Sequence, residues 1–383
     1  MTILEKLSIL GVSSRYDSSC GGGKEERIMP GVYRSSCGDG GHYSLLKILL
    51  TNYCEYDCAY CVNRKSNDVK RVIFTASEIC ELTKTYYNKG LIDGLFLSSG
   101  VLKSPDFTME LMLNAIKKLR IEYDYNGYIH LKIMPGCSEF LINEAIKYAD
   151  RVSVNLEIPN LSGLHKLCPQ KKEEFLLNPM IYIHNKILEN RYKKGQTTQL
   201  IVGATSDNDF QILKLSENLY KKVSMKRVYY SAFENINNNL NPPDKNLPLR
   251  ERRLYQADWL MRVYHFSLEE IIKPGLNLAL DIDPKTKWAI ENIEFFPIEI
   301  TRASFDELIR VPGIGLVSAR KIIEIRKKSY IDIFSLEKMG VIIKKARHFI
   351  TVNGRFYGFK TDNIDKLKDV LSEKSEEILL FNS

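Results

Sequence analysis

Six short apolar runs alternate with amphipathic stretches of helical period between residues 44 and 235, and this alternation restricts the fold more than any other feature. Short apolar runs bounded by turn signals are typical of buried strands. Parallel strands need a crossover connection, so strand–helix units of this kind build a parallel sheet with helices outside it. The expected strands are 44–51, 94–97, 128–134, 151–156, 198–202 and 227–230.

The helix expected after the first strand has a clear start and end. Thr75 is its predicted N-cap, and Glu78 is the acidic residue that completes a capping box. The helix is expected to end at Lys89-Gly90, and further helices are expected over 108–120 and 138–149. Six βα units predict an α/β fold, a partial (β/α)6 barrel that is open at the side where a substrate enters. Active groups are then expected at the carboxyl ends of the strands.

Three cysteines directly follow the first expected strand. Cys54, Cys58 and Cys61 have the spacing C-x-x-x-C-x-x-C. Thiolates are the usual ligands of iron–sulfur clusters, and close spacing lets one loop wrap one cluster. Four thiols would saturate a 4Fe–4S cube, whereas three leave one iron open to a substrate or cofactor. Structural zinc is an alternative, but zinc sites more often show paired C-x-x-C units, and His42 has the wrong spacing for a finger. Inert thiols are the third interpretation.

With the aromatic Tyr60 just before the last cysteine, the motif resembles the signature of the radical S-adenosylmethionine (SAM) superfamily. The resemblance implies that the open iron is chelated by the amino and carboxylate groups of SAM. It also implies that one electron cleaves SAM to methionine and a 5′-deoxyadenosyl radical, which abstracts hydrogen from the substrate. The expected cofactors are therefore a 4Fe–4S cluster and SAM, and the expected electron donor is a protein such as flavodoxin or ferredoxin.

Small and polar residues at the strand ends are the expected SAM contacts. The segment starting at Ser98 occupies the place of the superfamily's Gly-Gly-Glu-like segment, although it lacks the acid, and small residues permit close approach. The expected contacts to the ribose or methionine part lie after the fourth strand, and those to adenine after the fifth and sixth. Ordinary strand-to-loop turns are the alternative for each position. The residues are Ser98, Ser99, Gly100, Asn155, Glu157, Gly203, Tyr230 and Ser231, with Asp207 as a further candidate.

Composition places the chain among soluble globular proteins. Of its residues, 44% are hydrophobic and 27% are charged, which is ordinary for that class. The length of 383 residues is sufficient for two domains. No apolar run reaches the roughly 18 residues that span a membrane, and the first residues lack a signal core, so we expect a cytoplasmic protein. Eight cysteines are too few for a disulfide framework. A second cluster on Cys20 and Cys37 is a minor alternative, because only two ligands are visible.

The positive charge is concentrated near the C-terminus. Residues 301–360 contain 13 Lys and Arg against 5 Asp and Glu, an excess of eight that equals the net charge of +8 of the whole chain. A basic module on a neutral body suggests a polyanionic partner, and a solvated basic surface is the alternative.

Residues 308–323 resemble the helix-hairpin-helix motif of sequence-independent DNA-binding proteins. The two glycines of the hairpin expose backbone N–H groups, and the following helix N-terminus favours an anion such as phosphate. Phosphate contacts position a protein on DNA without reading its sequence. A degenerate second copy covers 335–347. The expected DNA-binding residues are Pro312, Gly313, Gly315, Arg320, Lys321, Lys344, Lys345 and Arg347, with Arg326 also within reach of phosphate. A protein-docking hairpin is the alternative.

At full length, the chain resembles a family of DNA-modification or DNA-repair radical SAM proteins often associated with a uracil-DNA-glycosylase-like partner. The matching segments lie within residues 40–355. The resemblance implies an enzyme that modifies or repairs a nucleotide in DNA. The expected domains are an N-terminal loop extension (1–43), the radical SAM partial barrel (44–240), a connector that completes the barrel (241–300) and a small all-α helix-hairpin-helix domain with a tail (301–383).

Three other functions stay open on the sequence. The radical chemistry could act on RNA or a free nucleotide, or it could reverse a pyrimidine dimer as in spore-photoproduct-lyase-like repair. A non-enzymatic DNA-binding scaffold with structural zinc is the third. Asp281, Asp283 and Lys285 either contribute to the active site or form a solvated loop, and Cys137 and Cys168 are unranked candidates for quenching a radical.

Overall fold

The computed structural model describes residues 1–14, 25–36, 42–190, 194–237, 246–358 and 364–372. Cys20 and Cys37 lie outside these residues, so the second-cluster alternative is not addressed by the structure. The chain divides into two compact units. The first comprises residues 1–207 and 214–251, and the second comprises 208–213 and 252–383. Among the described residues, no helix combines the length and the apolar character that crossing a bilayer requires.

An eight-stranded sheet forms the first unit, with its strands in the order of the sequence from β1 to β8. Strands β3 to β8 pair in parallel, whereas β2 pairs antiparallel with both β1 and β3. Within the part of the chain that the structure describes, the outer strands β1 and β8 do not pair with each other, so the sheet stays open. The predicted partial (β/α)6 barrel is thus confirmed. The strands are β1 (Glu25–Met29), β2 (Val32–Ser36), β3 (His42–Leu49), β4 (Gly94–Ser98), β5 (Tyr128–Lys132), β6 (Arg151–Ser153), β7 (Gly195–Val202) and β8 (Arg227–Ala232).

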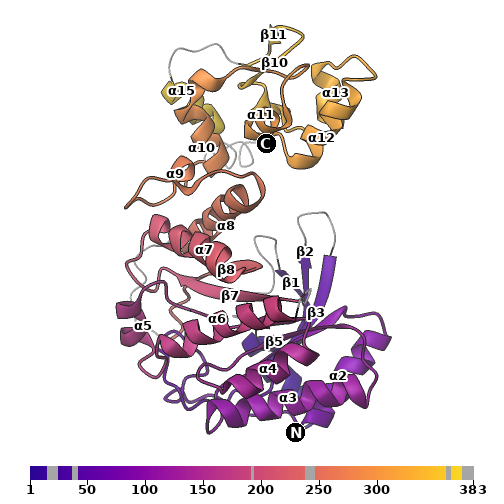
Figure 1. Ribbon diagram of the computed structural model, residues 1–383, viewed down its shortest axis with the longest axis vertical. Coiled ribbons are helices and arrows are strands. Elements are labelled where there is room, and N and C mark those ends of the chain that lie inside the picture. Colours follow the sequence, from indigo (N-terminus) through magenta and orange to yellow (C-terminus); the bar gives the residue numbers. More distant parts are fainter. Residues whose placement is uncertain (15–24, 37–41, 191–193, 238–245, 359–363, 373–383) are drawn as a thin grey trace. The chain divides into compact units, whose positions relative to one another are not determined.

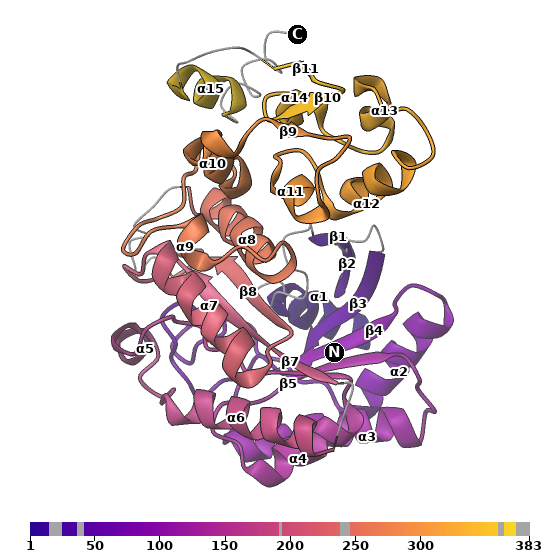
Figure 2. The same cartoon turned by 45° about the horizontal axis from the view of Figure 1, so that its top comes forward.

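Helices connect the parallel strands, and several lie along one face of the sheet in both views (Figures 1 and 2). Strand residues on both faces are buried, as covered parallel sheets require. In β3 the consecutive residues Leu46, Lys47 and Ile48, which point alternately to opposite faces, are each fully buried. Thr75 and Glu78 form the predicted capping box of α2. The helices of this unit are α1 (Ile3–Ser13), α2 (Ala76–Asn88), α3 (Pro105–Ile121), α4 (Glu139–Tyr148), α5 (Leu161–Leu167), α6 (Glu174–Glu189) and α7 (Asp209–Val223), whose first residues belong to the second unit.

The prediction of an irregular N-terminal extension is wrong for the described residues before β3. Helix α1 begins with a capping box between Thr2 and Glu5, a signal that is legible in the sequence. The helix packs close to the β1–β2 turn, because Gly11 leaves room for the backbone of Gly31, and the hydroxyl of Tyr33 donates to the carbonyl of Gly11 at 2.9 Å. The extension is therefore part of the folded unit and adds two strands to the sheet.

The second unit consists of short helices and a small sheet. Strands β10 and β11 form a hairpin around Asn353-Gly354, and β9 pairs in parallel with β10. The sequence-based expectation of an all-α domain is therefore wrong, because the unit contains this small sheet. Its elements are α8 (Leu247–Val263, which begins in the first unit), α9 (Leu268–Ile271), α10 (Pro284–Glu291), η2 (Ile293–Phe295), β9 (Ile298–Glu299), α11 (Phe305–Arg310), α12 (Leu316–Ile325), α13 (Ile333–Lys338), α14 (Ile343–Ala346), β10 (Ile350–Val352), β11 (Arg355–Phe356) and α15 (Ile364–Leu371).

Candidate active site

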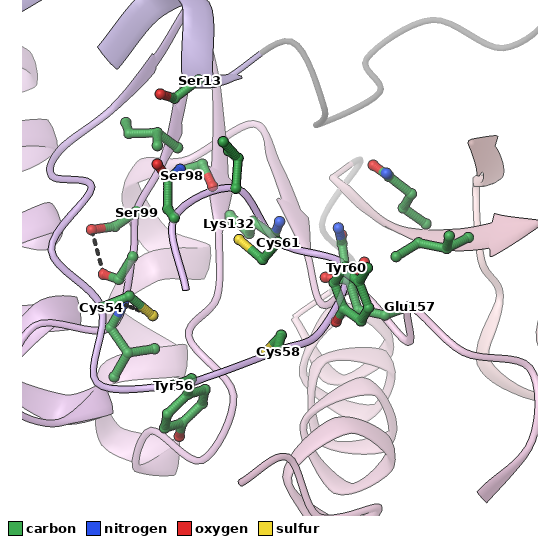
Figure 3. A pocket seen from close by; sticks show the side chains of 18 of the residues that line it. Ser13, Cys54, Tyr56, Cys58, Tyr60, Cys61, Ser98, Ser99, Lys132 and Glu157 are labelled. Atoms are coloured by element: carbon green, nitrogen blue, oxygen red, sulfur yellow. Dashed lines mark hydrogen bonds between the residues drawn. The ribbon is translucent and has the colours of Figure 1, made fainter. Parts of the chain in front are cut away.

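The cysteine loop, defined here as residues 50–74, joins β3 to α2. It leaves the carboxyl end of β3, the position expected for active groups in a parallel sheet. Cys58 is buried, and Cys54 and Cys61 are half-buried. Figure 3 shows the three side chains along one stretch of the loop, with Ser98 and Ser99 on one side and Tyr60 and Glu157 on the other.

Arg71 ties the two ends of the cysteine loop together. Its guanidinium donates to four backbone carbonyl groups, and these belong to residues before and after the cysteines: Asn52, Asn63, Arg64 and Asn67. A guanidinium is suited to this role because it presents several N–H donors in a fixed plane. The loop conformation is thus held by a side chain rather than by regular secondary structure.

The end of β4 lies directly against the loop. The Gly100 N–H donates to the carbonyl of Thr51 at 2.8 Å, and the N–H of Val101 donates to the sulfur of Cys54 at 3.4 Å. A Cβ at Gly100 would lie 2.3 Å from the carbonyl oxygen of Tyr53, so this position requires glycine. The β4 end and the cysteine loop therefore pack backbone to backbone.

One pocket opens at the carboxyl ends of the strands and is lined by all three cysteines. Its space, counted out to the open mouth, is about 1120 Å³, which is large enough for a cofactor and part of a substrate. Polar groups reach it from the ends of β4 and β5, from the loop after β6 and from β7 and β8, and apolar side chains fill the walls between them. The lining includes Ser98, Ser99, Gly100, Lys132, Ile133, Met134, Asn155, Glu157, Lys171, Gln199, Ile201, Ser231 and Phe233.

A buried ion pair forms one wall of this pocket. The Lys171 Nζ lies 3.2 Å from Oε1 of Glu157 and 3.2 Å from the hydroxyl of Tyr60. Burial alone would lower the pKa of Lys171, but the negative charge of Glu157, together with that of Cys58, outweighs burial and raises it. Lys171 is therefore a cation at neutral pH.

The sequence model of the Radical SAM superfamily matches residues 48–219, from the end of β3 into α7. This range contains the cysteine loop and the whole of the parallel strands β4 to β7. Residues 48–219 form a radical SAM domain. Radical SAM enzymes bind a 4Fe–4S cluster and SAM, so these are the cofactors of the domain.

Solved structures similar to this chain include the FeFe-hydrogenase maturase HydG from Carboxydothermus hydrogenoformans, with 17% identity over 56% of this chain and 50% of that chain and a TM-score of 0.46. Methylornithine synthase (PylB) has 14% identity over 54% of this chain and 61% of its own, with a TM-score of 0.41. Coproporphyrinogen III oxidase (HemN) from Escherichia coli, described as a radical SAM enzyme, has 11% identity over 49% and 45%, with a TM-score of 0.37. The similarity thus spans less than two thirds of each relative. No curated protein matches the sequence.

The donor set of the radical SAM domain fits an iron–sulfur cluster. Burial raises the pKa of Cys54, and it raises that of Cys61 to about 12, whereas a hydrogen bond from the Cys168 thiol lowers the pKa of Cys58 to about 7. Among the described residues, no three His, Cys, Asp or Glu side chains are arranged to hold a single metal ion. The ligands of a cube bind separate iron atoms, so they do not converge as the ligands of one ion do. Three thiols around one pocket are compatible with that arrangement.

Six of the eight predicted SAM contacts line the pocket of the radical SAM domain: Ser98, Ser99, Gly100, Asn155, Glu157 and Ser231. Tyr230 does not. Its side chain is fully buried, and its hydroxyl donates to the hydroxyl of Ser216 at 2.8 Å. Successive strand residues point to opposite faces, so Ser231 faces the pocket and Tyr230 faces the helices. This part of the prediction needs correction.

Gly203 and Asp207 also lie away from the lining of the pocket. Gly203 has φ +90° and packs against Leu247. The carboxylate of Asp207 accepts two hydrogen bonds from the amide of Asn160, at 2.7 and 2.6 Å, and one from the hydroxyl of Thr205. These residues shape the loop after β7 and do not line the pocket.

Two lysines of the pocket were missed from the sequence. Lys132 is the last residue of β5, where a cation at a strand end is a signal that could have been used. Lys171 follows α5 by a few residues and has no local signal. Of the two candidates for quenching a radical, Cys168 contacts Cys58, whereas Cys137 is buried without lining the pocket.

In the second unit, α11 and α12 are joined by a tight turn, and α13 and α14 by a similar one. Gly313 and Gly340 adopt positive φ values of +83° and +87° at equivalent places in the two turns. The N–H of Ile342 donates to the carbonyl of Gly313 at 2.9 Å, which joins the turns to each other. The second copy therefore forms a hairpin around Gly340, with Ile342 as the helix N-cap where the first copy has Gly315.

The predicted DNA-binding residues have different surroundings. Arg320, Lys321, Lys344 and Arg347 are exposed, Gly313 and Gly315 are half-buried, and Pro312 is buried. Lys345 forms an ion pair with Asp283 at 2.8 Å. Arg326 is also engaged internally, since its guanidinium donates to the carbonyls of Ile300 and Ala303. The prediction that Arg326 and Lys345 reach phosphate needs correction, because each is used to hold the unit together.

The three polar residues before α10 have structural partners within the second unit. Asp283 is the N-cap of α10, Lys285 donates to the carbonyl of Ile314 at 2.6 Å, and Asp281 pairs with Lys368 at 3.5 Å. None of them lines the pocket of the radical SAM domain. The prediction that they contribute to that site is replaced by structural roles: Lys285 supports the first hairpin, Asp283 pairs with Lys345 of the second, and Asp281 pairs with Lys368 of α15.

Proposed function

We propose that this chain is a radical SAM enzyme in which Cys54, Cys58 and Cys61 hold the 4Fe–4S cluster and the adjoining pocket holds SAM. The observation that carries the proposal is the convergence of these three thiols on one pocket at the carboxyl ends of parallel strands. The cluster and SAM together supply one-electron chemistry that removes a hydrogen atom from a substrate. Three protein thiols leave one iron for SAM, since a cube has four.

The polar wall of the pocket suits the polar groups of SAM. The segment Ser98–Gly100 brings backbone groups close to the cysteine loop, where they can accept from an amino group. Lys132 offers a cation for a carboxylate, and Asn155 and Glu157 offer hydrogen-bond partners for ribose hydroxyls. Asn155 and Glu157 are both buried. These roles involve the polar residues at the ends of β4 and β5 and those that follow β6.

The apolar part of the lining has a different task. Ile133, Met134, Ile201 and Phe233 form walls without donors or acceptors in their side chains. A reactive radical needs an environment from which water is excluded, because water exclusion prevents side reactions. The apolar lining thus supports hydrogen abstraction inside the pocket.

We further propose that the substrate is a nucleotide in DNA. The support comes from the paired hairpins and from the exposed basic side chains of Arg320, Lys321, Lys344 and Arg347. Contacts from such side chains to the phosphate backbone of DNA give affinity without sequence preference. A base within a duplex is not accessible to a pocket, so the target nucleotide would be extruded or single-stranded. A uracil-DNA-glycosylase-like partner and a flavodoxin- or ferredoxin-type donor belong to the same proposal.

Anaerobic reconstitution with iron and sulfide tests the first proposal. We expect 4Fe–4S absorption and cleavage of SAM in the presence of dithionite, and the loss of both when Cys54, Cys58 and Cys61 are changed together to Ala. Zinc near one per chain with no iron would instead identify a scaffold. The triple variant also tests folding, because far-ultraviolet circular dichroism should stay unchanged if the cysteines serve only the cluster.

Nucleic-acid binding tests the second proposal. We expect duplex DNA to bind with a strong salt dependence, and we expect Arg320→Ala with Lys321→Ala to weaken it. Equal or tighter binding of RNA under the same conditions would favour the RNA alternative. Mass spectrometry of nucleosides from DNA incubated with the reconstituted enzyme would identify the product, and reversal of thymine dimers would favour the spore-photoproduct-lyase-like reaction.

A further inference from the structure

The segment Leu167–Lys171 contacts four consecutive residues of the cysteine loop. The N–H of Ala59 donates to the carbonyl of Leu167 at 2.8 Å, and the N–H of Asp57 lies 3.4 Å from the side-chain oxygen of Gln170. Cys58 and Tyr60, the other two residues of the loop stretch 57–60, also have partners. The Cys168 thiol contacts Cys58, and the Lys171 ammonium contacts the Tyr60 hydroxyl. Four consecutive loop residues are thus matched by one short segment more than 100 residues later in the chain.

Lys171 brings a full positive charge to this interface. It is 9% exposed, so water screens the charge little. Lys171 lines the same pocket as Cys54, Cys58 and Cys61, and its ammonium contacts the hydroxyl of Tyr60, which lies between the last two of these cysteines in the sequence. Glu157 faces it from the loop after β6, in a buried pair with side-chain exposures of 11% for Lys171 and 8% for Glu157.

Taking the two charges of an ion pair out of water costs free energy, and good geometry with further hydrogen bonds is needed to offset that cost. Hydrogen bonds of the main chain hold Glu157 in place. Its N–H donates to the carbonyl of Gln199 at 2.9 Å, and its own carbonyl accepts from the N–H of Ile201 at 2.6 Å. Glu157 also adopts a positive φ of +63°, which is uncommon outside glycine. The ion pair is therefore held rigidly beside the cysteines.

We propose that Lys171 is a positioning residue of the cluster site, whose charge offsets that of the thiolate-ligated cluster and raises the cluster's reduction potential. The inference rests on the proposed function, because it assumes that the three cysteines hold the cluster. Charge and hydrogen bonds around the sulfur ligands are established determinants of cluster potentials. Adding an electron increases the negative charge of the cluster, and a buried cation stabilises that state.

The test is a potentiometric titration of the reconstituted protein without SAM, followed by electron paramagnetic resonance of the reduced cluster. We expect Lys171→Met to lower the reduced-to-oxidised ratio at a fixed potential about tenfold, which corresponds to a negative shift of about 59 mV for one electron. Lys171→Arg keeps the charge and should retain the wild-type potential. Lys172→Met removes the same charge from an exposed neighbour, where water screens it, and should leave the potential unchanged.

The Glu157→Gln variant gives the opposite sign. It leaves Lys171 without its counter-charge, so the potential should move to a more positive value. A merely structural role would lower iron content in both variants without shifting the potential of the loaded fraction. A Lys171→Met potential equal to that of the wild type, or shifts of the same sign in Lys171→Met and Glu157→Gln, would overturn the inference.

Iron content separates failure of this inference from failure of the proposed function. A wild-type protein that takes up no iron contradicts the proposed cluster itself. A wild type that loads, together with Lys171→Met, Lys171→Arg and Glu157→Gln variants that do not, would show that the pair is a structural support and would also overturn the inference. If Lys171→Met alone stays empty, the sign of the Glu157→Gln shift decides.

Discussion

The side-chain amide of Asn237 donates to the carbonyl oxygen of Cys61 at 3.1 Å, across 176 residues of sequence. The same amide donates to the carbonyl of Ala59 at 2.8 Å, and the side-chain oxygen of Asn237 accepts from Asn67. Asn237 follows β8, and Ile236 beside it lines the pocket. The last strand of the sheet is thereby connected to the loop that follows the first parallel strand.

We expect Asn237→Ala to speed the loss of iron from the reconstituted protein. Each hydrogen bond contributes about 1 kcal/mol, so release to a chelator should accelerate roughly fivefold for one bond and more for two. The measurement is iron release followed by absorbance. Asn88→Ala at the exposed end of α2 is the matched control and should release iron at the wild-type rate. Equal rates for both variants would contradict the role of Asn237.

Arg71→Met should loosen the cysteine loop before any cofactor binds. The substitution removes four hydrogen bonds to carbonyl groups, and we expect a loss of about 3 kcal/mol of local stability. Hydrogen–deuterium exchange should increase over residues 52–67 of the apoprotein. Lys70→Met changes the exposed neighbouring cation and should leave that exchange unaffected, whereas an unaltered pattern in Arg71→Met would refute the prediction.

The second unit should become more stable as the pH rises from about 7 to 10. Burial lowers the pKa of Lys285 to about 7, so in this window the unfolded chain binds the proton and the folded unit does not. Stability rises with pH wherever the unfolded state holds more protons. Below about pH 7 the lysine is charged in both states, and the folded unit bears the full cost of burying it.

Denaturant unfolding at several pH values checks this dependence. Both tryptophans of the chain, Trp259 and Trp288, belong to the second unit, so their fluorescence reports on it. The stability of the wild type relative to Lys285→Met should increase between about pH 7 and 10. Lys327→Met, at an exposed position, should retain the wild-type slope. A Lys285→Met protein with the same pH dependence as the wild type would contradict the prediction.

Lys344 and Lys345 are adjacent, but substituting one should alter DNA binding and substituting the other should alter stability. Lys344 is exposed, and under the proposed DNA-binding function Lys344→Met should weaken duplex binding and reduce the slope of log K against log salt by about one. Lys345 pairs with Asp283, whose side chain is largely buried. Lys345→Met should therefore destabilise the second unit by about 3 kcal/mol, because it leaves a buried carboxylate without its partner.

The salt dependence of binding distinguishes the two variants. Lys345→Met should keep the wild-type slope when it is measured below its unfolding transition. If instead Lys345→Met reduced the slope while Lys344→Met did not, the assignment of the two lysines would be reversed.

Local patterns in the sequence were sufficient for the parallel sheet. The strands at 94–98 and 227–232 were predicted to within two residues, because each is a short apolar run between turn signals. The capping box at Thr75 correctly placed the start of α2, but the equivalent signal at Thr2 was overlooked, so α1 was missed. The β-hairpin at Asn353-Gly354 was likewise legible, since this dipeptide favours the turn.

Local sequence is enough to predict the βα alternation and the hairpin around Gly313, and it contains the spacing of Cys54, Cys58 and Cys61, because each feature depends on neighbours along the chain. The folded structure was needed to find that Lys171 and Asn237 reach the cysteine loop, that Ser231 rather than Tyr230 faces the pocket, and that Lys345 pairs with Asp283. These contacts join residues tens to more than a hundred positions apart or depend on which face of a strand is covered. No local pattern encodes them, since they form only when the sheet brings its strand ends together.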